Sequence, residues 1–277
     1  MVAFPNCKIN LGLNVIERRR DGYHNIETVF YPVLWQDALE VIENNNSKLP
    51  FLLSESGNNI NTQTENNLIY KAWQLIIKEK KMPNIKVHLH KSIPTGAGLG
   101  GGSADAAFFI NCVNTKFNFN FSQNDKLNIA SKIGSDCAFF INNKAVFAKG
   151  KGNEFDEITL DLSRFYILLV NTNIHCDTKE AYNSLIPKKP IYDLRHSIKN
   201  KPIELWKKYL TNDFEEIIFK KYPSIKELKD LLYLNNAIYA SMSGSGSSVF
   251  GIFNEEPHIT FPNSYKLFLQ NPNTIYE

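Results

Sequence analysis

Five of the seven residues from Gly96 to Gly102 are glycines. Because glycine tolerates positive φ and has no Cβ, backbone N–H groups in such a loop can turn toward a ligand and approach it closely. The alternating segment from Ile85 to His90 predicts a strand before the loop, and the Ala- and Phe-rich segment from Ser103 to Asn114 predicts a helix after it, with Ser103 near the N-cap. A helix N-terminus has unpaired N–H donors and a partial positive charge, so this arrangement predicts a phosphate-binding loop.

The loop does not match the two most familiar phosphate-binding motifs. A Walker A loop ends in Gly-Lys-Ser/Thr, and no lysine follows these glycines. A dinucleotide-binding loop requires an acidic residue about 20 positions further on. Asp125 has roughly this spacing but lies in a polar connection. A flexible turn is the plain alternative, although a turn between a strand and an Ala-rich helix rarely needs five glycines.

A second group of polar side chains lies on the segment from Lys8 to Ile16, whose strict alternation predicts a strand. Its apolar residues point toward a core, whereas Lys8 and Asn10 share the other face. On this pattern alone, a water-facing surface and a functional surface are equally open. Asp136 lies just after a predicted helix of residues 125–133, at a junction with an apolar segment that would hold its side chain in place.

Composition excludes several classes of protein. With 277 residues and 43% apolar residues, the chain is long enough for one large domain or two modest ones. A net charge of +3 is too small to predict nucleic-acid or membrane partners, and no apolar run approaches the roughly 20 residues of a membrane span. The N-terminus lacks the pattern of a signal peptide. The four scattered cysteines form no CxxC pair, so we expect free thiols and a cytoplasmic location.

The linker-like segment of residues 149–153 predicts a boundary near residue 150, between a first domain over 1–150 and a second domain over 151–277. The Gly/Ser run from Ser243 to Gly246 is compatible with an ordinary hairpin loop. The tail from Phe261 has little periodicity.

Apolar periodicity predicts helices over residues 66–81, 178–185 (capped by Thr178) and, with interruptions, 203–234. It predicts strands over residues 28–35, 39–42, 145–148, 165–170, 237–242 and 247–253.

Three segments resemble, in order, the three motifs of the GHMP kinases: Pro5 to Leu13, Pro94 to Ala107, and Ser241 to Gly251. The central match is long and specific. The resemblance implies an α+β fold of two domains, an N-terminal ATP domain like domain 2 of ribosomal protein S5 and a C-terminal ferredoxin-like domain, with the active site in the cleft between them. Residues 190–235 contribute little to the resemblance.

Within this family, Gly22-Tyr23-His24 and Gly134-Ser135-Asp136 resemble a branch whose acceptor carries a cytidine diphosphate group. The resemblance therefore implies transfer of the γ-phosphoryl of ATP to the 2-hydroxyl of a methylerythritol unit, a step of the non-mevalonate isoprenoid precursor pathway. Another small-molecule kinase, of the homoserine or mevalonate type, and a non-catalytic nucleotide-binding relative remain as alternatives. The chain is expected to be a monomer or a weak homodimer.

The resemblance also assigns roles to individual residues. Lys8 and Asp136 match the catalytic lysine and aspartate, where a carboxylate accepts the proton of the attacking hydroxyl and an ammonium stabilises the developing charge. No dedicated metal site is expected; Mg²⁺ would arrive with ATP and contact Ser103. The residues expected to hold ATP are Asn67, Leu68, Pro94, Thr95, Gly96, Ala97, Gly98, Leu99, Gly100, Gly101, Gly102, Ser103 and Ala104.

The acceptor would be bound by residues of the first and third motifs, of the segment Gly22-Tyr23-His24 and of the second domain. Tyr23 and Tyr182 would stack on the cytosine ring, and His24 would hydrogen-bond to its edge. The family often has Phe at the position of Tyr182. The remaining residues expected to contact the acceptor are Asn10, Thr178, Gly244 and Gly246.

Overall fold

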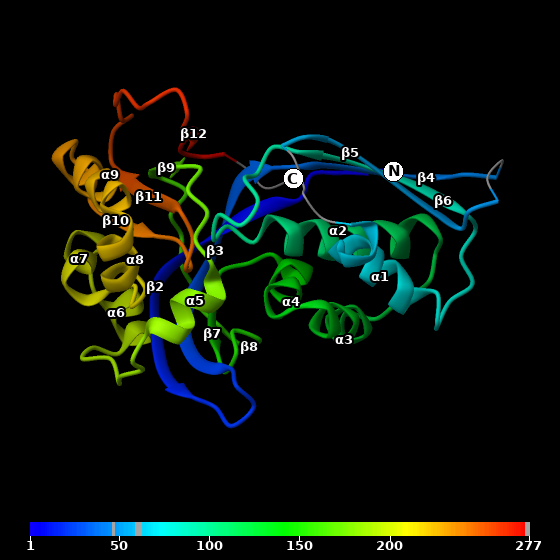
Figure 1. Ribbon diagram of the computed structural model, residues 1–277, viewed down its shortest axis with the longest axis horizontal. Coiled ribbons are helices and arrows are strands. Elements are labelled where there is room, and N and C mark those ends of the chain that lie inside the picture. Colours follow the sequence, from blue (N-terminus) through cyan, green and yellow to red (C-terminus); the bar gives the residue numbers. More distant parts are fainter. Residues whose placement is uncertain (46–47, 59–62, 275–277) are drawn as a thin grey trace. The chain divides into compact units, whose positions relative to one another are not determined.

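The computed structural model describes residues 1–45, 48–58 and 63–274, and the chain divides into two compact units (Figure 1). Unit 1 contains residues 1–7, 35–95 and 100–144, and unit 2 contains residues 8–34, 96–99 and 145–277. The chain thus passes between the units at both ends of the short segment 96–99. The boundary proposed near residue 150 stays a prediction, because each unit combines segments that are far apart in the sequence.

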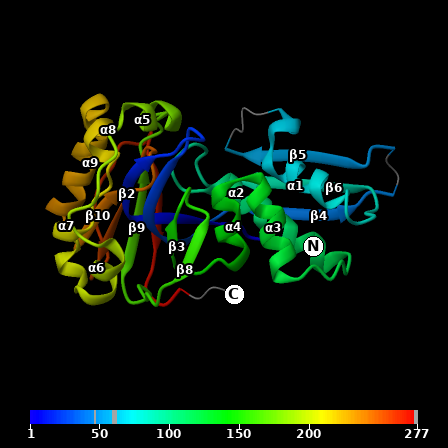
Figure 2. The same cartoon turned by 90° about the horizontal axis from the view of Figure 1, so that it is seen from below.

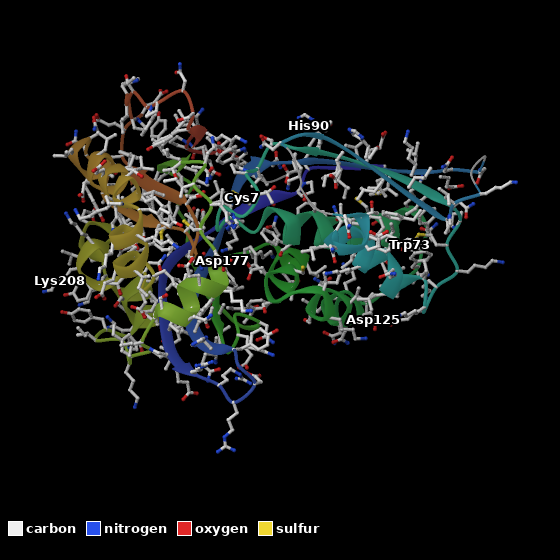
Figure 3. All side chains as sticks on the ribbon, viewed as in Figure 1. Cys7, Trp73, His90, Asp125, Asp177 and Lys208 are labelled. Carbon is white, nitrogen blue, oxygen red and sulfur yellow. The ribbon has the colours of Figure 1, made fainter. Side chains whose placement is uncertain are left out.

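Unit 1 is a four-stranded sheet with helices on one face (Figure 1). The sheet order is β1-β4-β6-β5, and only β5 and β6 are parallel. The opposite face carries polar side chains, such as His90, whose ring hydrogen-bonds to Ser56 at 3.0 Å (Figure 3). The elements are β1 (Val2–Ala3), β4 (Ala38–Glu43), β5 (Phe51–Gly57), η1 (Thr64–Asn66), α1 (Leu68–Ile76), β6 (Ile85–Lys91), α2 (Gly101–Lys116), α3 (Gln123–Ile133) and α4 (Ser135–Asn142).

The helix predicted over residues 66–81 is shorter in the structure, because it is capped at a defined residue. α1 begins at Leu68, where the side chain of Asn67 accepts a hydrogen bond from the backbone N–H of Ile69 at 2.9 Å. It ends at Ile76. The strand predicted over residues 85–90 is confirmed as β6, whose alternate residues are buried.

The position of Ser103 corrects the expected start of the helix after the glycine loop. The N-cap is Gly100, at φ +72°, and α2 begins at Gly101. Glycine reaches this left-handed conformation without steric cost, so the helix starts earlier than a serine cap predicts. Ser103 is therefore the third residue of α2. Asp136 likewise lies inside a helix, in the first turn of α4.

Unit 2 contains two four-stranded sheets, in the orders β2-β3-β7-β8 and β10-β11-β9-β12. Helices α6 to α9 lie together along one side of the second sheet (Figure 2). The elements are β2 (Asn6–Arg18), β3 (His24–Gln36), β7 (Val146–Lys149), β8 (Glu154–Glu157), β9 (Tyr166–Asn171), α5 (Thr178–Ser184), α6 (Leu194–Asn200), η2 (Ile203–Leu205), α7 (Trp206–Tyr209), α8 (Glu215–Lys221), α9 (Pro223–Leu234), β10 (Tyr239–Met242), β11 (Ser248–Phe253) and β12 (Lys266–Gln270).

A single hydrophobic core joins the two sheets of unit 2. Leu13 and Val15 of β2 belong to the same buried cluster as Leu168 of β9 and Leu232 of α9. The apolar face predicted for the first strand is therefore confirmed. Since burial of apolar surface is the main driving force for folding, this cluster fixes β2, and with it the polar residues on its other face.

Several elements of unit 2 differ from the sequence-based expectation. The cap of α5 is Asp177, which accepts a hydrogen bond from the N–H of Glu180 at 2.9 Å, and Thr178 is the first helical residue. The tail contains β12, which pairs antiparallel with β9. α6 and β8 were not predicted either. These elements are short and partly exposed, so their hydrophobic pattern is weak and their partners in the fold decide their conformation.

A buried ion triad in unit 1 joins the end of β6 to α2. The ammonium of Lys91 lies 2.8 Å from Asp105 Oδ2 and also contacts the carboxylate of Asp37. Asp37 Oδ1 accepts hydrogen bonds from the backbone N–H groups of Ser92 (2.6 Å) and Ile93 (2.9 Å). All three charged side chains are at most 3% exposed. The triad therefore holds the segment that leads into the glycine loop.

The charges of this triad are not balanced, because two carboxyl groups share one ammonium. Burial raises the pKa of Asp105 to about 8, with Asp37 adding to the shift and Lys91 opposing it. Asp105 Oδ1 has no hydrogen-bond partner among the described residues. An unpartnered buried oxygen costs less on a neutral acid than on a carboxylate, which favours the protonated form. Asp105 thus has a structural role that the sequence did not reveal.

We expect Asp105→Asn to remove a pH dependence of stability. In the wild-type protein the pKa of Asp105 is raised from 3.8 to about 8 on folding, so between these values the folded state binds more protons than the unfolded state. The contribution of this group to the free energy of unfolding therefore falls as the pH rises. An asparagine side chain does not titrate in this range, so it adds no such pH dependence to the free energy of unfolding. Urea unfolding at about pH 5 and about pH 8 should show that the free energy of unfolding of the variant increases relative to that of the wild type as the pH rises. The same change with pH in both proteins would contradict the raised pKa of Asp105.

Candidate active site

In unit 1 the first turn of α2 presents backbone N–H groups beside open space. An ideal Cβ on Gly101 would lie 3.0 Å from Ile93 Cγ2 and 3.2 Å from Lys91 Nζ, so this glycine is needed for packing. A Cβ on Gly102 would meet nothing within 4 Å. The N–H groups of this turn lack helical partners and lie at the positive end of the helix dipole, which suits an anion.

A cavity of about 170 Å³ lies next to this turn. Asn67 is already engaged in the structure, since it caps α1 and donates to Glu55 Oε1 at 2.9 Å. Its side chain is therefore fixed in orientation. Within unit 1 the cavity connects Asn67 and Leu68, which were predicted to bind ATP, to the glycine loop. It is lined by Asn66, Asn67, Leu68, Lys91, Thr95, Gly102 and Asp105.

Asp136 lies in the first turn of α4, half-buried, directly before Cys137. Burial raises the pKa of the Cys137 thiol to about 12, and the hydroxyl of Ser103 forms a hydrogen bond to this thiol. The first turns of α2 and α4 therefore meet. The starts of these two helices thus lie together in unit 1, with Ser103 in the first turn of one and Asp136 in the first turn of the other, and such helix starts are suitable for binding phosphate oxygens.

In unit 2 the face of β2 that carries Lys8 and Asn10 is buried rather than exposed to water. Lys8 is 4% exposed and Asn10 is 2% exposed. The ammonium of Lys8 donates to Asn10 Oδ1 at 2.6 Å and to the carbonyl oxygen of Gly98 at 3.1 Å. Asn10 Nδ2 in turn donates to Thr28 Oγ1 at 2.9 Å, and Thr28 donates to the carbonyl oxygen of Gly12 at 2.6 Å. Burying a lysine side chain is costly, and Asn10 and the carbonyl oxygen of Gly98 hold this one at a defined place, which points to function rather than stability.

The first half of the glycine loop packs directly on the third motif. A Cβ on Gly98, which has φ +79°, would lie 2.0 Å from the carbonyl oxygen of Ser243. A Cβ on Gly246 would lie 2.4 Å from the backbone N of Gly98. The hydroxyl of Ser243 also donates to the carbonyl oxygen of Gly98 at 2.9 Å. The run from Ser243 to Gly246 is thus more than a hairpin loop, because it supports the loop that is predicted to bind phosphate.

Gly244 and Thr178 were both predicted to contact the acceptor. Gly244 lies against the same loop, since its ideal Cβ would be 3.3 Å from the Cα of Gly98. Thr178 accepts a hydrogen bond from the hydroxyl of Ser245 at 2.9 Å. The third motif therefore links these two residues, and their contact with an acceptor stays a prediction.

His24 and Tyr182 are brought together by the fold of unit 2. Their rings stack with centroids 5.0 Å apart and an interplanar angle of 24°. Phe214 packs edge-on against Tyr182, with centroids 4.7 Å apart. Burial, with a further contribution from Arg18, lowers the pKa of His24. The imidazole is therefore neutral at neutral pH, with one N–H donor and one acceptor nitrogen.

Tyr23 does not share this environment. Its side chain is 60% exposed, and the ammonium of Lys151 lies 4.7 Å from its ring centroid. The backbone N–H of Tyr23 donates to Asp21 Oδ1 at 3.2 Å, which is part of the turn between β2 and β3. The stacking of Tyr23 on a base stays a prediction.

Several residues that position the predicted ones were not predicted from the sequence. Thr28 orients Asn10, Ser243 holds Gly98, and Lys91 with Asp37 holds the approach to the glycine loop. For Ser243, its place inside the Gly/Ser run was a signal. Thr28, Lys91 and Asp37 lie in ordinary strand patterns, so only their three-dimensional partners reveal them.

Lys8 belongs to unit 2 and Asp136 to unit 1, so their joint action in one reaction stays a prediction. Within residues 1–45, 48–58 and 63–274, no group of three or more His, Cys, Asp or Glu side chains is arranged to hold a metal ion. Over the same residues, no helix has the length and apolar character that crossing a membrane requires.

We expect Gly246→Ala to destabilise unit 2, because the added Cβ collides with the backbone of Ala97 and Gly98. Displacing packed backbone should cost about 1–3 kcal/mol of the free energy of unfolding. Gly102→Ala is the matched control, since its Cβ enters open space and alanine favours a helix. Urea unfolding should show a loss for the first variant only. Equal stability of Gly246→Ala and wild type would contradict the packing role.

The family of this chain follows from comparisons with known proteins. Residues 67–144 match the GHMP kinases N terminal domain, and residues 194–260 match the GHMP kinases C terminal family. A protein of Bacteroides fragilis named 4-diphosphocytidyl-2-C-methyl-D-erythritol kinase is 48% identical over 260 residues, which cover 94% of each chain. The expected α+β architecture of the family is confirmed.

Solved structures agree with this result. A crystal structure of 4-(cytidine 5'-diphospho)-2C-methyl-D-erythritol kinase superimposes with a TM-score of 0.76 and 26% identity, covering 91% of this chain and 90% of that one. A homoserine kinase from Cytophaga hutchinsonii superimposes with a TM-score of 0.64 and 14% identity, over 97% of this chain and 95% of that one, and shares the fold alone. The chain therefore belongs to the GHMP kinases, and within them to the family of 4-diphosphocytidyl-2-C-methyl-D-erythritol kinases.

Proposed function

We propose that this enzyme transfers the γ-phosphoryl of ATP to the 2-hydroxyl of 4-diphosphocytidyl-2-C-methyl-D-erythritol, in the non-mevalonate route to isoprenoid precursors. The likeness to kinases of this name along nearly the whole chain carries the proposal. The geometry within each unit supports it, since one unit offers two helix N-termini with a carboxylate and the other a buried lysine and a stacked His–Tyr pair.

Asp136 is proposed as the base that accepts the proton of the acceptor hydroxyl as its oxygen attacks the phosphorus. Lys8 would stabilise the negative charge on the transferring phosphoryl group. Its ammonium is held in place by Asn10 and by the carbonyl oxygen of Gly98, so little reorganisation is needed when charge develops. Phosphoryl transfer depends mainly on positioning and charge stabilisation, which these buried groups provide.

ATP would lie along the glycine loop, with its phosphates on the N–H groups of Gly96 to Ser103 and its base in the cavity beside Asn67 and Leu68. Mg²⁺ is proposed to accompany the nucleotide, where it neutralises phosphate charge. The hydroxyl of Ser103, in the first turn of α2, is a hard oxygen donor, so it fits the ligand preference of this ion.

The His24–Tyr182 pair is proposed to recognise cytosine. A neutral imidazole offers one donor and one acceptor, which complements the N3 acceptor and the N4 amino donor of the base. The Tyr182 ring, supported by Phe214, provides an aromatic surface close to that edge. Homoserine and mevalonate carry no aromatic base, so this arrangement favours the cytidine substrate over the alternative kinase activities. A pure nucleotide binder needs neither Lys8 nor Asp136.

The location and assembly of the enzyme are also proposals. All four cysteines are free thiols with buried side chains, which suits a reducing compartment such as the cytoplasm, where ATP is available. A monomer or weak homodimer, without nucleic-acid or membrane partners, stays the expectation. The modest net charge of +3 supports it.

We expect Asp136→Asn to lower kcat by about 10²–10⁴-fold with little change in ATP affinity, because the amide cannot accept the proton but preserves the shape of the side chain. A coupled assay with the diphosphocytidyl substrate, homoserine and mevalonate, together with calorimetry of ATP binding, measures both. Asp125→Asn is the control. Its carboxylate also lies in the first turn of a helix, but it accepts a hydrogen bond from the backbone N–H of the N-cap residue Ser122 at 2.9 Å. Its replacement should therefore lower stability only. An Asp136→Asn enzyme with wild-type activity would contradict the assignment of Asp136 as the base.

The pKa of His24 sets a further expectation. Because burial and Arg18 lower this pKa below its ordinary 6.5, the KM for the cytidine substrate should stay constant through that pH and rise only below it, where protonation removes the acceptor nitrogen. His24→Ala should raise this KM by about tenfold, since one lost pocket hydrogen bond costs ~1–3 kcal/mol, and the rise at low pH should disappear. A change confined to the KM for ATP would mean that the cytosine pocket lies elsewhere.

A further inference from the structure

The short segment from Thr211 to Asp213, between α7 and α8, pairs with the strand that carries the proposed catalytic lysine. The backbone N–H of Leu13 donates to the carbonyl oxygen of Thr211 at 2.8 Å, and the N–H of Asp213 donates back to Leu13 at 2.9 Å. The carboxylate of Asp213 accepts a hydrogen bond from the N–H of Val15 at 2.7 Å. Asn212 is thereby fixed beside β2.

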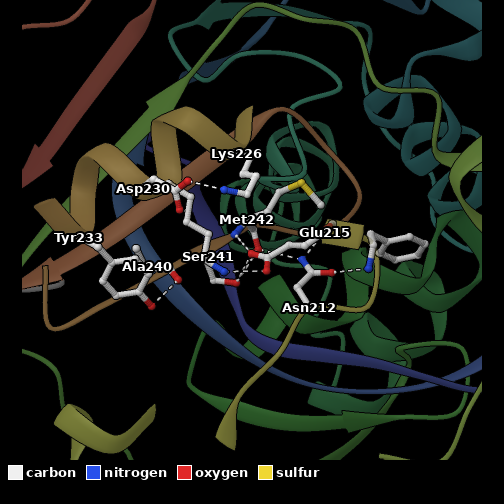
Figure 4. Close-up of polar contacts among 11 residues, drawn as sticks. Asn212, Glu215, Lys226, Asp230, Tyr233, Ala240, Ser241 and Met242 are labelled. Atoms are coloured by element: carbon white, nitrogen blue, oxygen red, sulfur yellow. Dashed lines mark hydrogen bonds and ion pairs between the residues drawn. The ribbon is translucent and has the colours of Figure 1, made fainter. Parts of the chain in front are cut away.

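The side chain of Asn212 uses both of its N–H donors on the third motif (Figure 4). Nδ2 donates to the carbonyl oxygen of Met242 at 2.9 Å and to that of Gly244 at 2.8 Å. Its Oδ1 accepts from the N–H of Phe214 at 3.0 Å, which fixes the orientation of the amide. Asn212 is 4% exposed. The two carbonyl groups that flank Ser243 are therefore held by one buried amide.

Glu215, in the first turn of α8, holds the same strand end (Figure 4). Its Oε1 accepts hydrogen bonds from the N–H of Met242 at 2.9 Å and from the hydroxyl of Ser241 at 3.1 Å. Its Oε2 lies 2.6 Å from the ammonium of Lys229. The backbone on each side of residue 243 is thus restrained by side chains from a region in which the sequence showed no functional signal.

The restrained residue, Ser243, contacts the groups that orient the catalytic lysine. Its hydroxyl donates to the carbonyl oxygen of Gly98 at 2.9 Å and lies 3.4 Å from Asn10 Oδ1. Those two oxygens are also acceptors of the Lys8 ammonium. A path within unit 2 therefore runs from the amide of Asn212, through the backbone of Met242 and Gly244 to Ser243 between them, and then by hydrogen bonds to Gly98, Asn10 and Lys8.

We propose that Asn212 is a positioning residue for phosphoryl transfer, which sets the place of Ser243 and thereby that of Gly98 and Lys8; the inference rests on the proposed function. The role needs a side chain with two N–H donors and no charge. Aspartate has no donor when ionised and would place a carboxylate against two carbonyl oxygens. Leucine or alanine would leave both buried acceptors without a protein partner.

The test is the substitution Asn212→Asp in the full chain, assayed for turnover and for ATP affinity. We expect kcat to fall by at least about tenfold and the dissociation constant for ATP to rise several-fold, because Gly98 of the glycine loop loses its support. A purely structural role would reduce the fraction of folded enzyme and so lower the apparent kcat, while the KM values and the ATP affinity of the folded fraction stay unchanged.

A pH profile provides a second, specific readout. Burial against two carbonyl groups should raise the pKa of the new carboxyl group. Once protonated, this group has one O–H donor and can hold one of the two carbonyls. The ratio of variant to wild-type kcat should therefore recover partly as the pH falls. Asn212→Ala leaves a polar space that water can enter, so its kcat should be lowered without recovering at low pH. This variant also serves as the test if the aspartate variant does not fold.

Asn235→Asp is the matched control. Its amide also donates to a backbone carbonyl oxygen, that of Leu231 at 2.9 Å, but it lies at the end of α9 and does not contact the third motif. Both kcat and ATP affinity should match the wild type. Calorimetry of ATP binding does not depend on the identity of the acceptor. Failure of the wild-type protein to phosphorylate the cytidine substrate would thus count against the function, whereas unchanged kcat and ATP affinity in folded Asn212 variants would overturn this inference.

Discussion

The close contact between two backbone segments in unit 2 is the constraint on which the proposed site depends. Gly98 and Gly246 approach so closely that neither position has room for a Cβ, and Ser243 is hydrogen-bonded to the loop at the same point. Side chains cannot be accommodated at such a contact, so glycine is required for steric reasons as well as for its conformational freedom. The shape of the glycine loop is therefore set partly by the third motif and not by the loop alone.

The same contact explains why Lys8 can be buried. An ammonium is costly to remove from water unless acceptors surround it. Here the carbonyl oxygen of Gly98 and the amide oxygen of Asn10 provide them, and both oxygens are fixed by further hydrogen bonds to Ser243 and Thr28. The ammonium of Lys8 is thereby held at a defined place beside Gly98, as its proposed role in phosphoryl transfer requires.

Unit 1 positions its part of the proposed site through a buried ion triad and the starts of two helices. The Lys91–Asp37–Asp105 triad is fully buried and fixes the backbone before the glycine loop, while Gly100 starts the helix after it. A buried ion pair contributes little net stability, because desolvation offsets the attraction. Its value here is that it allows few alternative positions for Ser92 and Ile93. The helix dipoles of α2 and α4 then provide a fixed, partly positive surface where Ser103 and Cys137 meet.

The sequence by itself determined the glycine loop, the alternating strand with Lys8 and Asn10, most of the regular elements, and through three motifs the family. These features are local, because glycine content and hydrophobic period report the backbone conformation of their own segment. Only the tertiary structure decided that Asp105 is buried with Lys91, that His24 stacks on Tyr182, and that Asn212 holds the third motif. Each of these pairs is separated by many residues in the chain. Their interactions arise from packing between elements, which a local pattern does not encode.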